Sequence, residues 1–191
     1  MAFSGKACAK QAGGFLAVAA IVFGGYIAYL QLSGNFHEVI AGQFYRSGQP
    51  SAAQLDRYIK DHGIRTVINL RGENLDAPWY QQELAQSQSL GITHIDFGMS
   101  AGKALTMPQT EQLISLLRDA PKPILVHCQG GADRSGLVSV IYMQQVAHID
   151  EDVAEEQLSP LYGHVALPFL SRSYAMDDSW ETLEKLLGIS T

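Results

Sequence analysis

The sequence predicts an α/β fold, with a central, mostly parallel sheet flanked by helices and preceded by one transmembrane helix. Three observations support this prediction. From residue 44 onward, short apolar runs alternate with helical segments, as in sheets whose strands are joined by helical crossovers. Residues 13–30 carry no charge over a length that can cross a bilayer. A glycine-bearing loop then joins the last apolar run to a helix.

The bulk composition is that of a globular protein and argues against a nucleic-acid binder. The chain has 191 residues, of which 47% are hydrophobic and 17% are charged, and its formal net charge is -6. It contains no stretch rich in Lys and Arg that would neutralise a phosphate backbone. We therefore expect no nucleic acid among its partners.

The apolar run from Gly13 to Leu30 predicts a membrane anchor over residues 13–32. Tyr26 and Tyr29 lie near one end of it, where aromatic rings favour the membrane interface. A buried helix of a soluble domain would show a polar face, which this run lacks. A cleaved signal peptide would need a small-x-small site soon after the apolar core, and none is convincing there. We expect an uncleaved, single-pass anchor.

Charges on either side of this span predict its orientation. Lys6 and Lys10 precede it in a tail over residues 1–12, whereas Glu38 and then Arg46 follow it. The positive-inside rule places the tail in the cytoplasm and the rest of the chain on the non-cytoplasmic side, which is the periplasm in a bacterium.

A linker over residues 33–43 is expected to lead into one globular domain over residues 44–191. Ser51, with Gln54 three residues later, resembles a capping box that opens a helix ending at Gly63. Short apolar and β-branched runs predict the strands between the helices. The predicted strands are Phe44–Arg46, Thr66–Leu70, Ile92–Phe97 and Ile124–His127.

Proline and glycine mark the limits of the next helices. Pro78 suits an early helical position, and Gly91 stops that helix near Ser89. Pro108 opens another helix that reaches Asp119. The remaining helices are predicted over residues 135–147, after an Asp150 cap, around His164–Leu170 and over Asp177–Leu187.

The two cysteines predict neither a disulfide nor a metal site. Cys8 precedes the membrane segment and Cys128 lies deep in the domain, so the two are not expected to meet. No Cys/His spacing suggests a metal ion. We expect Cys128 to be a free thiol, and we expect no metal and no cofactor.

The segment Ile124–Gly136 (ILVHCQGGADRSG) is a strand, a tight loop and a helix start, and this arrangement suits an anion. Gly130 and Gly131 can adopt backbone angles that let successive N–H groups point into one concavity. The following helix adds its positive dipole end. Arg134 supplies a planar charged fork, and these groups together favour the thiolate of Cys128, which is then placed to attack phosphorus.

This loop resembles the HCxxGxxR[S/T] motif of cysteine-dependent phosphatases, the protein-tyrosine and dual-specificity group. The resemblance extends to Phe44–Ser51 and Gly63–Arg71, which look like bacterial dual-specificity-like phosphatases. It implies that Cys128 forms a phosphocysteine, Arg134 holds phosphoryl oxygens, and Ser135 steadies the departing thiolate. It also implies that His127 orients the loop from behind. The residues expected to bind phosphate are Gln129, Gly130, Gly131, Ala132, Asp133, Arg134 and Ser135.

The general acid of such a mechanism is not where the family commonly has it. The loop Gly98–Met107, in which the family carries an Asp, contains no Asp or Glu. Asp133 within the motif is the favoured substitute, ahead of Asp96 and Asp76. Each of these also has a structural interpretation, as a partner of main-chain amides or an arginine, a solvent-facing side chain or a helix cap. A leaving group that needs no acid is the remaining alternative.

Other charged residues have open roles. Arg71 and Arg46 follow or lie within predicted strands, where they could reach a second charged group of the substrate or pair with the protein's own carboxylates. Lys103 is a weaker candidate for the same role. The histidines without ligand spacing are expected to be incidental, namely His37, His62, His94, His148 and His164.

The expected function is metal-independent hydrolysis of a phosphomonoester, most simply of the protein-tyrosine or dual-specificity type. Because an anchor would place the site near a bilayer, a phospholipid or inositol phosphate headgroup is the alternative substrate. A phosphate-binding membrane module without turnover is the alternative from a different class. The expected partners are a phosphorylated protein or such a headgroup, together with the membrane.

Overall fold

The computed structural model describes residues 4–168 and 170–188, the side chains of 4–12 and 16 excepted. The chain divides into two compact units, Met1–Ser33 and Gly34–Thr191. The first holds the helix α1 (Ser4–Ser33). Its stretch Gly13–Ser33 is long and apolar enough to cross a membrane, a property that signal sequences share. The prediction for Cys8 lies outside the described side chains.

The second unit is built on a five-stranded sheet with the order β1-β2-β5-β3-β4. The strands β2, β5, β3 and β4 run parallel to one another, and β1 is antiparallel to β2. The predicted mostly parallel α/β sheet is thereby confirmed. The strands are β1 (His37–Ile40), β2 (Phe44–Ser47), β3 (Thr66–Asn69), β4 (Thr93–Asp96) and β5 (Ile124–His127).

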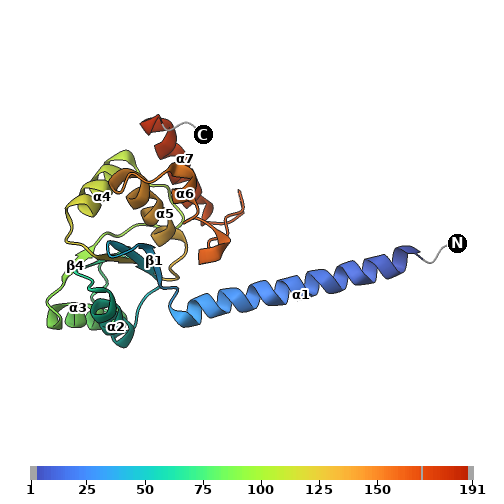
Figure 1. The fold of residues 1–191 in the computed structure, drawn as a ribbon, viewed down its shortest axis with the longest axis horizontal. Helices are drawn as coiled ribbons and strands as arrows, with labels where there is room; N and C mark the ends of the chain where they lie inside the picture. Colours follow the sequence, from blue (N-terminus) through green and yellow to red (C-terminus); the bar gives the residue numbers. More distant parts are fainter. Residues whose placement is uncertain (1–3, 169, 189–191) are drawn as a thin grey trace. The chain divides into compact units, whose positions relative to one another are not determined.

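Helices cover both faces of this sheet. In Figure 1, α2 and α3 lie on one side of the strands, and α4 to α7 lie on the other. Both predicted helices that begin near Ser51 and Pro78 are present, and the capping box of Ser51 with Gln54 forms as expected. The helices are α2 (Ala52–His62), α3 (Pro78–Ser89), α4 (Met107–Asp119), α5 (Asp133–Ile141), α6 (Glu151–Glu155) and α7 (Tyr174–Leu187).

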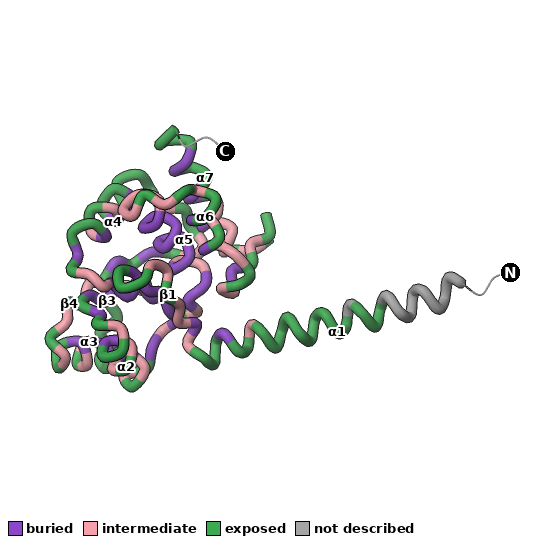
Figure 2. Tube along the Cα trace, in the orientation of Figure 1, coloured by how far each residue is buried: buried purple, intermediate pink, exposed green. Residues whose placement is uncertain are grey.

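Alternate residues along the strands build two cores, because successive side chains of a strand point to opposite faces. Phe44 packs in a cluster with Leu137 of α5. Its neighbour Tyr45 packs in another with Leu55 of α2. Figure 2 shows α5 as largely buried, and its residues from Ser135 to Ile141 are all buried, so packing holds this helix in place.

Three elements differ from the predictions. The segment expected as a linker contains β1, whose four residues HEVI alternate too briefly to predict a strand. This strand pairs with Phe44–Arg46 of β2. The helix predicted around His164–Leu170 is wrong: residues 164–168 are not helical, and a single turn, Pro160–Tyr162, precedes them. Pro168 explains this, since the residue before a proline is driven out of the helical region. The helix predicted over residues 135–147 begins earlier, at Asp133, and continues beyond Ile141 as a wider turn, Tyr142–Val146.

The carboxyl ends of the strands bring a row of polar side chains together. Ser47 is in register with His127, and His127 with Asn69. Asn69 is in turn in register with Asp96. In parallel sheets this edge is where ligands bind, and the loop after His127 begins there.

Candidate active site

The sulfur of Cys128 lies at the base of the loop that joins β5 to α5, hereafter the Cys128 loop (residues 128–134). The thiol is free and its residue only 2% exposed. The Gly131 amide donates a hydrogen bond to Sγ at 3.2 Å, and the Ser135 hydroxyl lies 3.3 Å from it. These donors and the start of α5 stabilise negative charge on the sulfur.

Main-chain carbonyls of this loop are bound from the outside. The Gln49 amide donates to the carbonyl of Gln129 at 3.1 Å. The side-chain amide of Asn35 donates to the carbonyl of Gly130 at 2.9 Å. Residues distant in sequence therefore fix the direction in which each of these peptide groups points.

Arg46 binds the next two carbonyls. Its Nη2 donates to the carbonyls of Gly131 and Ala132 at 2.9 and 2.8 Å, and its Nη1 donates to the main chain and side chain of Gln157. The side chain is fully buried. Burial lowers the pKa of the Arg46 guanidinium to about 10, so the group is still charged at neutral pH. The predicted roles of Arg46, in reaching a substrate or pairing with a carboxylate, are both corrected: it holds the backbone of the loop.

These contacts set the direction of the loop amides. In a planar trans peptide, the N–H of one residue points opposite to the carbonyl of the residue before it. Because the four carbonyls of residues 129–132 are bound outside, the amides of residues 130–133 face the inside of the loop. The hydrogen bond from the Gly131 amide to Sγ has this direction. The result is a cradle of N–H groups above the sulfur, which is a binding site for an anion.

Gly131 is required for this shape. Its φ is +73°, in the left-handed region that favours glycine. A Cβ there would also lie 2.5 Å from the Gly48 amide nitrogen. Either observation alone would explain why the loop has a glycine at this position.

The guanidinium of Arg134 lies beside the loops that follow β3 and β4. Its Nη1 donates to the carbonyls of Leu70 and Met99 at 3.2 and 3.3 Å. Its Nε is buried and has no hydrogen-bond partner among the residues that the structure describes. One edge of the fork is thus bound to the main chain, and an unpaired buried donor suits a ligand oxygen.

His127, directly before Cys128, is held by a buried glutamate that the sequence did not reveal. The His127 Nε2 lies 3.0 Å from Glu83 Oε1, and the His94 Nε2 lies 2.8 Å from the same oxygen. The prediction that His94 is incidental is therefore corrected. Burial by itself raises the pKa of Glu83, but hydrogen bonds from His127, His94 and Gln49 outweigh this effect and lower it to about 2.

Gln49 connects this carboxylate to Arg71 at the mouth of the site. Its Nε2 donates to Glu83 Oε2 at 2.7 Å, and its Oε1 accepts from Arg71 Nη1 at 2.9 Å. The Arg71 guanidinium also stacks over the ring of Trp79, 3.7 Å from its centroid. No local signal could have identified Glu83, since it lies 44 residues from His127.

Each of the three candidate acids has a distinct environment. Asp133 accepts from His164 Nδ1 at 2.8 Å, while the other ring nitrogen of His164 lies 3.0 Å from Asp177 Oδ2. Although burial opposes it, these two carboxylates raise the pKa of His164 to about 9. Asp133 therefore faces a protonated imidazole, and the prediction that His164 is incidental is also corrected.

The other two candidates are both exposed and differ in their surroundings. Asp96 accepts from Asn69 Nδ2 at 2.7 Å and from the Tyr80 hydroxyl at 2.5 Å. Asp76 is exposed, and the cap position of α3 is occupied by Ala77 instead.

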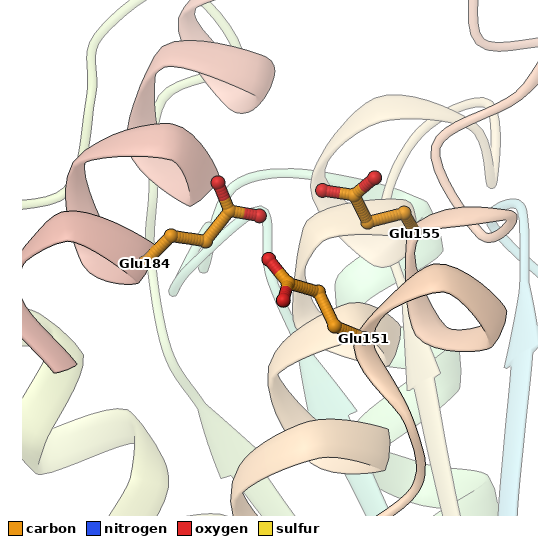
Figure 3. A group of neighbouring side chains, drawn as sticks. All are labelled: Glu151, Glu155 and Glu184. Atoms are coloured by element: carbon orange, nitrogen blue, oxygen red, sulfur yellow. The ribbon is translucent and has the colours of Figure 1, made fainter. Parts of the chain in front are cut away.

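Among the described residues, one group of carboxylates could hold a metal ion, and it shares no residue with the Cys128 loop. Glu151 and Glu155 of α6 and Glu184 of α7 point toward one another (Figure 3), and their oxygens lie within 4.8 Å of each other. Burial, together with the two neighbouring glutamates, raises the pKa of Glu184 to about 8. We refer to these three residues as the glutamate cluster.

Comparison with known proteins identifies relatives of this domain. Residues 32–168 match the family model described as DSP-PTPase phosphatase fused to NAD+ kinase. Chloroplastic NAD kinase 2 from Arabidopsis thaliana is 33% identical over 99 residues, which is 50% of this chain. The chain spans about a tenth of the length of that relative, since the match covers 10% of it.

Solved structures share the fold at low sequence identity. The TpbA protein from P. aeruginosa, in complex with phosphotyrosine, has a TM-score of 0.58 and 17% identity, with 83% of this chain and 93% of that chain covered. The core catalytic domain of the PP-IP phosphatase SIW14 from S. cerevisiae has a TM-score of 0.58 and 21% identity, with 81% and 93% covered. At these identities the likeness shows the fold alone.

Proposed function

The chain belongs to the DSP-PTPase phosphatase family whose members are described as fused to NAD+ kinase, and from this membership we propose that it hydrolyses phosphate monoesters through a phosphocysteine on Cys128, without a metal ion. The observation that carries this proposal is the position of the sulfur beneath a loop in which the carbonyls of residues 129–132 are bound from the outside. A phosphorylated molecule is accordingly its substrate.

In the first step the Cys128 thiolate attacks phosphorus. A sulfur–phosphorus bond forms, the bond from phosphorus to the ester oxygen breaks, and the leaving oxygen takes a proton. The amides of residues 130–133 and the guanidinium of Arg134 bind the three remaining phosphoryl oxygens and stabilise their charge in the transition state.

In the second step water replaces the sulfur. The water oxygen bonds to phosphorus and gives a proton to the carboxylate that protonated the leaving oxygen, the sulfur–phosphorus bond breaks, and inorganic phosphate leaves. The Ser135 hydroxyl, 3.3 Å from Sγ, stabilises the departing thiolate by hydrogen bonding.

Asp133 remains our proposed general acid, and its pairing with His164 makes a test necessary. A carboxylate held against a protonated imidazole is a poor proton donor unless the substrate displaces it. Asp133→Asn should therefore be compared on an aryl phosphate and an alkyl phosphate. Loss of kcat/KM at least about tenfold greater for the alkyl ester supports Asp133 as the acid, because only that leaving group needs a proton. Equal losses assign Asp133 to the support of α5.

Two substrate classes are compatible with this chemistry. A phosphotyrosine-type protein substrate is the default of the family. The apolar stretch Gly13–Ser33 favours the second class, phospholipid or inositol phosphate headgroups, because an anchored enzyme would meet them.

We propose that this stretch is a single-pass anchor and that the domain lies on the non-cytoplasmic side of the membrane. A C-terminal fusion to alkaline phosphatase, which is active only when exported, tests this orientation.

The nucleophile is tested with the full chain in detergent. The wild type should hydrolyse para-nitrophenyl phosphate in the presence of EDTA, and Cys128→Ser should abolish this activity. Cys8→Ser is the matched control and should retain it. Activity that survives in Cys128→Ser excludes this sulfur as the nucleophile. A phosphate-binding module without turnover would show no hydrolysis for vanadate to inhibit.

A further inference from the structure

A cavity of about 420 Å³ adjoins the site beside the loop Gly98–Met107, in which related phosphatases carry the general acid. Met99 lines it, and the Met99 carbonyl accepts from Arg134, so the cavity begins where the guanidinium is held. Its lining contains two cations and no carboxylate. The lining residues are Arg71, Gly98, Met99, Ser100, Lys103, Ala104, Leu105, Thr106 and Gln109.

Arg71 is fixed in place in this wall. Its Nη1 is bonded to Gln49 Oε1, and its guanidinium is stacked on Trp79. Burial and the nearby charge of Arg134 both lower the pKa of Arg71. The like charges of Arg71 and Arg134 repel each other in the free protein, and an anion bound between them would relieve this repulsion.

Besides Lys103, one more cation borders the loop Gly98–Met107. Lys103 is exposed on it, and the Arg172 side chain packs on Gly102, with Nε 3.0 Å from where a Cβ of that glycine would lie. Among the described residues, neither these two nor Arg71 and Arg134 form an ion pair with a carboxylate. In a chain of net charge -6 this is a local concentration of positive charge at one mouth of the site.

We propose that this cavity binds a second phosphate group of the substrate, with Arg71 and Lys103 as its ligands. The inference rests on the proposed function and narrows its substrate to small molecules or headgroups that carry at least two phosphates. One phosphate occupies the amide cradle and is cleaved, and the other is held by the two cations. A fixed arginine gives orientation, whereas a flexible lysine adds charge.

The test compares inositol bisphosphate with inositol monophosphate as substrates of the full chain in detergent, with para-nitrophenyl phosphate as the reference. The wild type should show kcat/KM at least about tenfold higher for the bisphosphate than for the monophosphate. Arg71→Met and Lys103→Met should each reduce that ratio severalfold or more. Arg118→Met, which removes an exposed arginine from the last turn of α4, should leave the ratio and the activity unchanged.

Each outcome separates the two proposals. Equal kcat/KM for the two inositol phosphates, or equal losses on all three substrates in both variants, overturns the second-phosphate site and leaves the phosphatase standing. If no substrate is hydrolysed, the proposed function fails. Calorimetry of the Cys128→Ser chain then tests the site alone. Bisphosphate must bind more tightly than monophosphate, and Arg71→Met must remove the difference, or the site is refuted.

The source of the second phosphate is settled with vesicles. Phosphatidylcholine vesicles that contain a phosphoinositide are offered beside the soluble bisphosphate. Preference for the vesicle substrate identifies a lipid headgroup, and preference for the soluble one identifies a free inositol phosphate. A singly phosphorylated tyrosine peptide that outperforms both contradicts the inference.

Discussion

At the Cys128 loop, amide groups and a guanidinium converge on one point, whereas at the glutamate cluster three carboxyl groups converge (Figure 3). The loop is held by fixed partners: Asn35, Gln49 and Arg46 bind its carbonyls, so its amides stay directed inward. In the cluster the like charges approach each other with less support, and Glu184 responds with a pKa of about 8, which keeps a proton on it at neutral pH. Groups that repel one another can thus be held close together in two ways. Hydrogen bonds to fixed partners hold the loop amides, and protonation of one carboxyl group reduces the repulsion in the glutamate cluster. Only the hydrogen-bonded loop keeps its positive electrostatic potential and can therefore attract a charged ligand.

The largest effect is expected at the rigid side of this comparison. Arg46→Met removes the Arg46 donors from the buried carbonyls of Gly131 and Ala132, of which the Ala132 carbonyl still accepts from the Gly136 amide. We expect the free energy of unfolding to fall by about 4 kcal/mol and phosphatase activity to be lost even where the protein is folded. Urea denaturation and the hydrolysis assay measure the two effects. Arg57→Met, at an exposed position on α2, should change stability by no more than about 0.5 kcal/mol. Full activity of the Arg46→Met variant would contradict the view that fixed partners hold the Cys128 loop in its active shape.

A smaller effect is expected at Glu83, which supports His127 in the same region. Its pKa is lowered from 4.5 to about 2, so its contribution to stability is present above pH 4.5 and is lost as the pH falls toward 2. From this shift we expect a contribution of about 3 kcal/mol above that range. Glu83→Gln should therefore be less stable than the wild type at neutral pH and should lose less stability on acidification. Glu111→Gln, exposed on α4, serves as the control. Parallel acid-unfolding curves for wild type and Glu83→Gln would argue against the buried network.

The smallest effect, and one of opposite sign, is expected at the glutamate cluster. Because the pKa of Glu184 is raised from 4.5 to about 8, the wild type has its full stability below pH 4.5 and loses part of it as the pH rises through 8. Glu184→Gln should then be more stable than the wild type at about pH 9, by about 1–2 kcal/mol, with a smaller difference in acid. Glu181→Gln on the exposed face of α7 is the control. Destabilisation of the wild type by EDTA, absent in Glu184→Gln, would instead indicate a bound cation in place of the proton.

Local signals in the sequence were sufficient for the elements that carry the chemistry. The capping box at Ser51 and the run before Cys128 form as predicted, because each depends on neighbours within a few residues. The strand β1 was missed because its stability comes from pairing with β2 and not from its own four residues.

The residues that hold the Cys128 loop in place could not be predicted from the sequence for the same reason. Glu83, Arg46 and His164 each contact a residue in or next to the Cys128 loop that lies at least 31 positions away along the chain. A glutamate in an unremarkable helix and an arginine within a short strand give no local indication of their partners. The fold was thus predictable from periodicity and the reactive loop from its motif, whereas the groups that brace the loop required the tertiary structure.

The contacts of the Asn35 side chain determine where a truncated form of this protein should begin. It bridges the carbonyls of Gly130 and Tyr162, and the neighbouring Gly34 carbonyl accepts from the Gly48 amide. A soluble fragment that starts at residue 44, where the sequence suggested the domain begins, would lack both contacts and the edge strand as well. A fragment that starts at Gly34 or earlier retains these contacts. A protease site or an affinity tag should therefore be placed before Gly34.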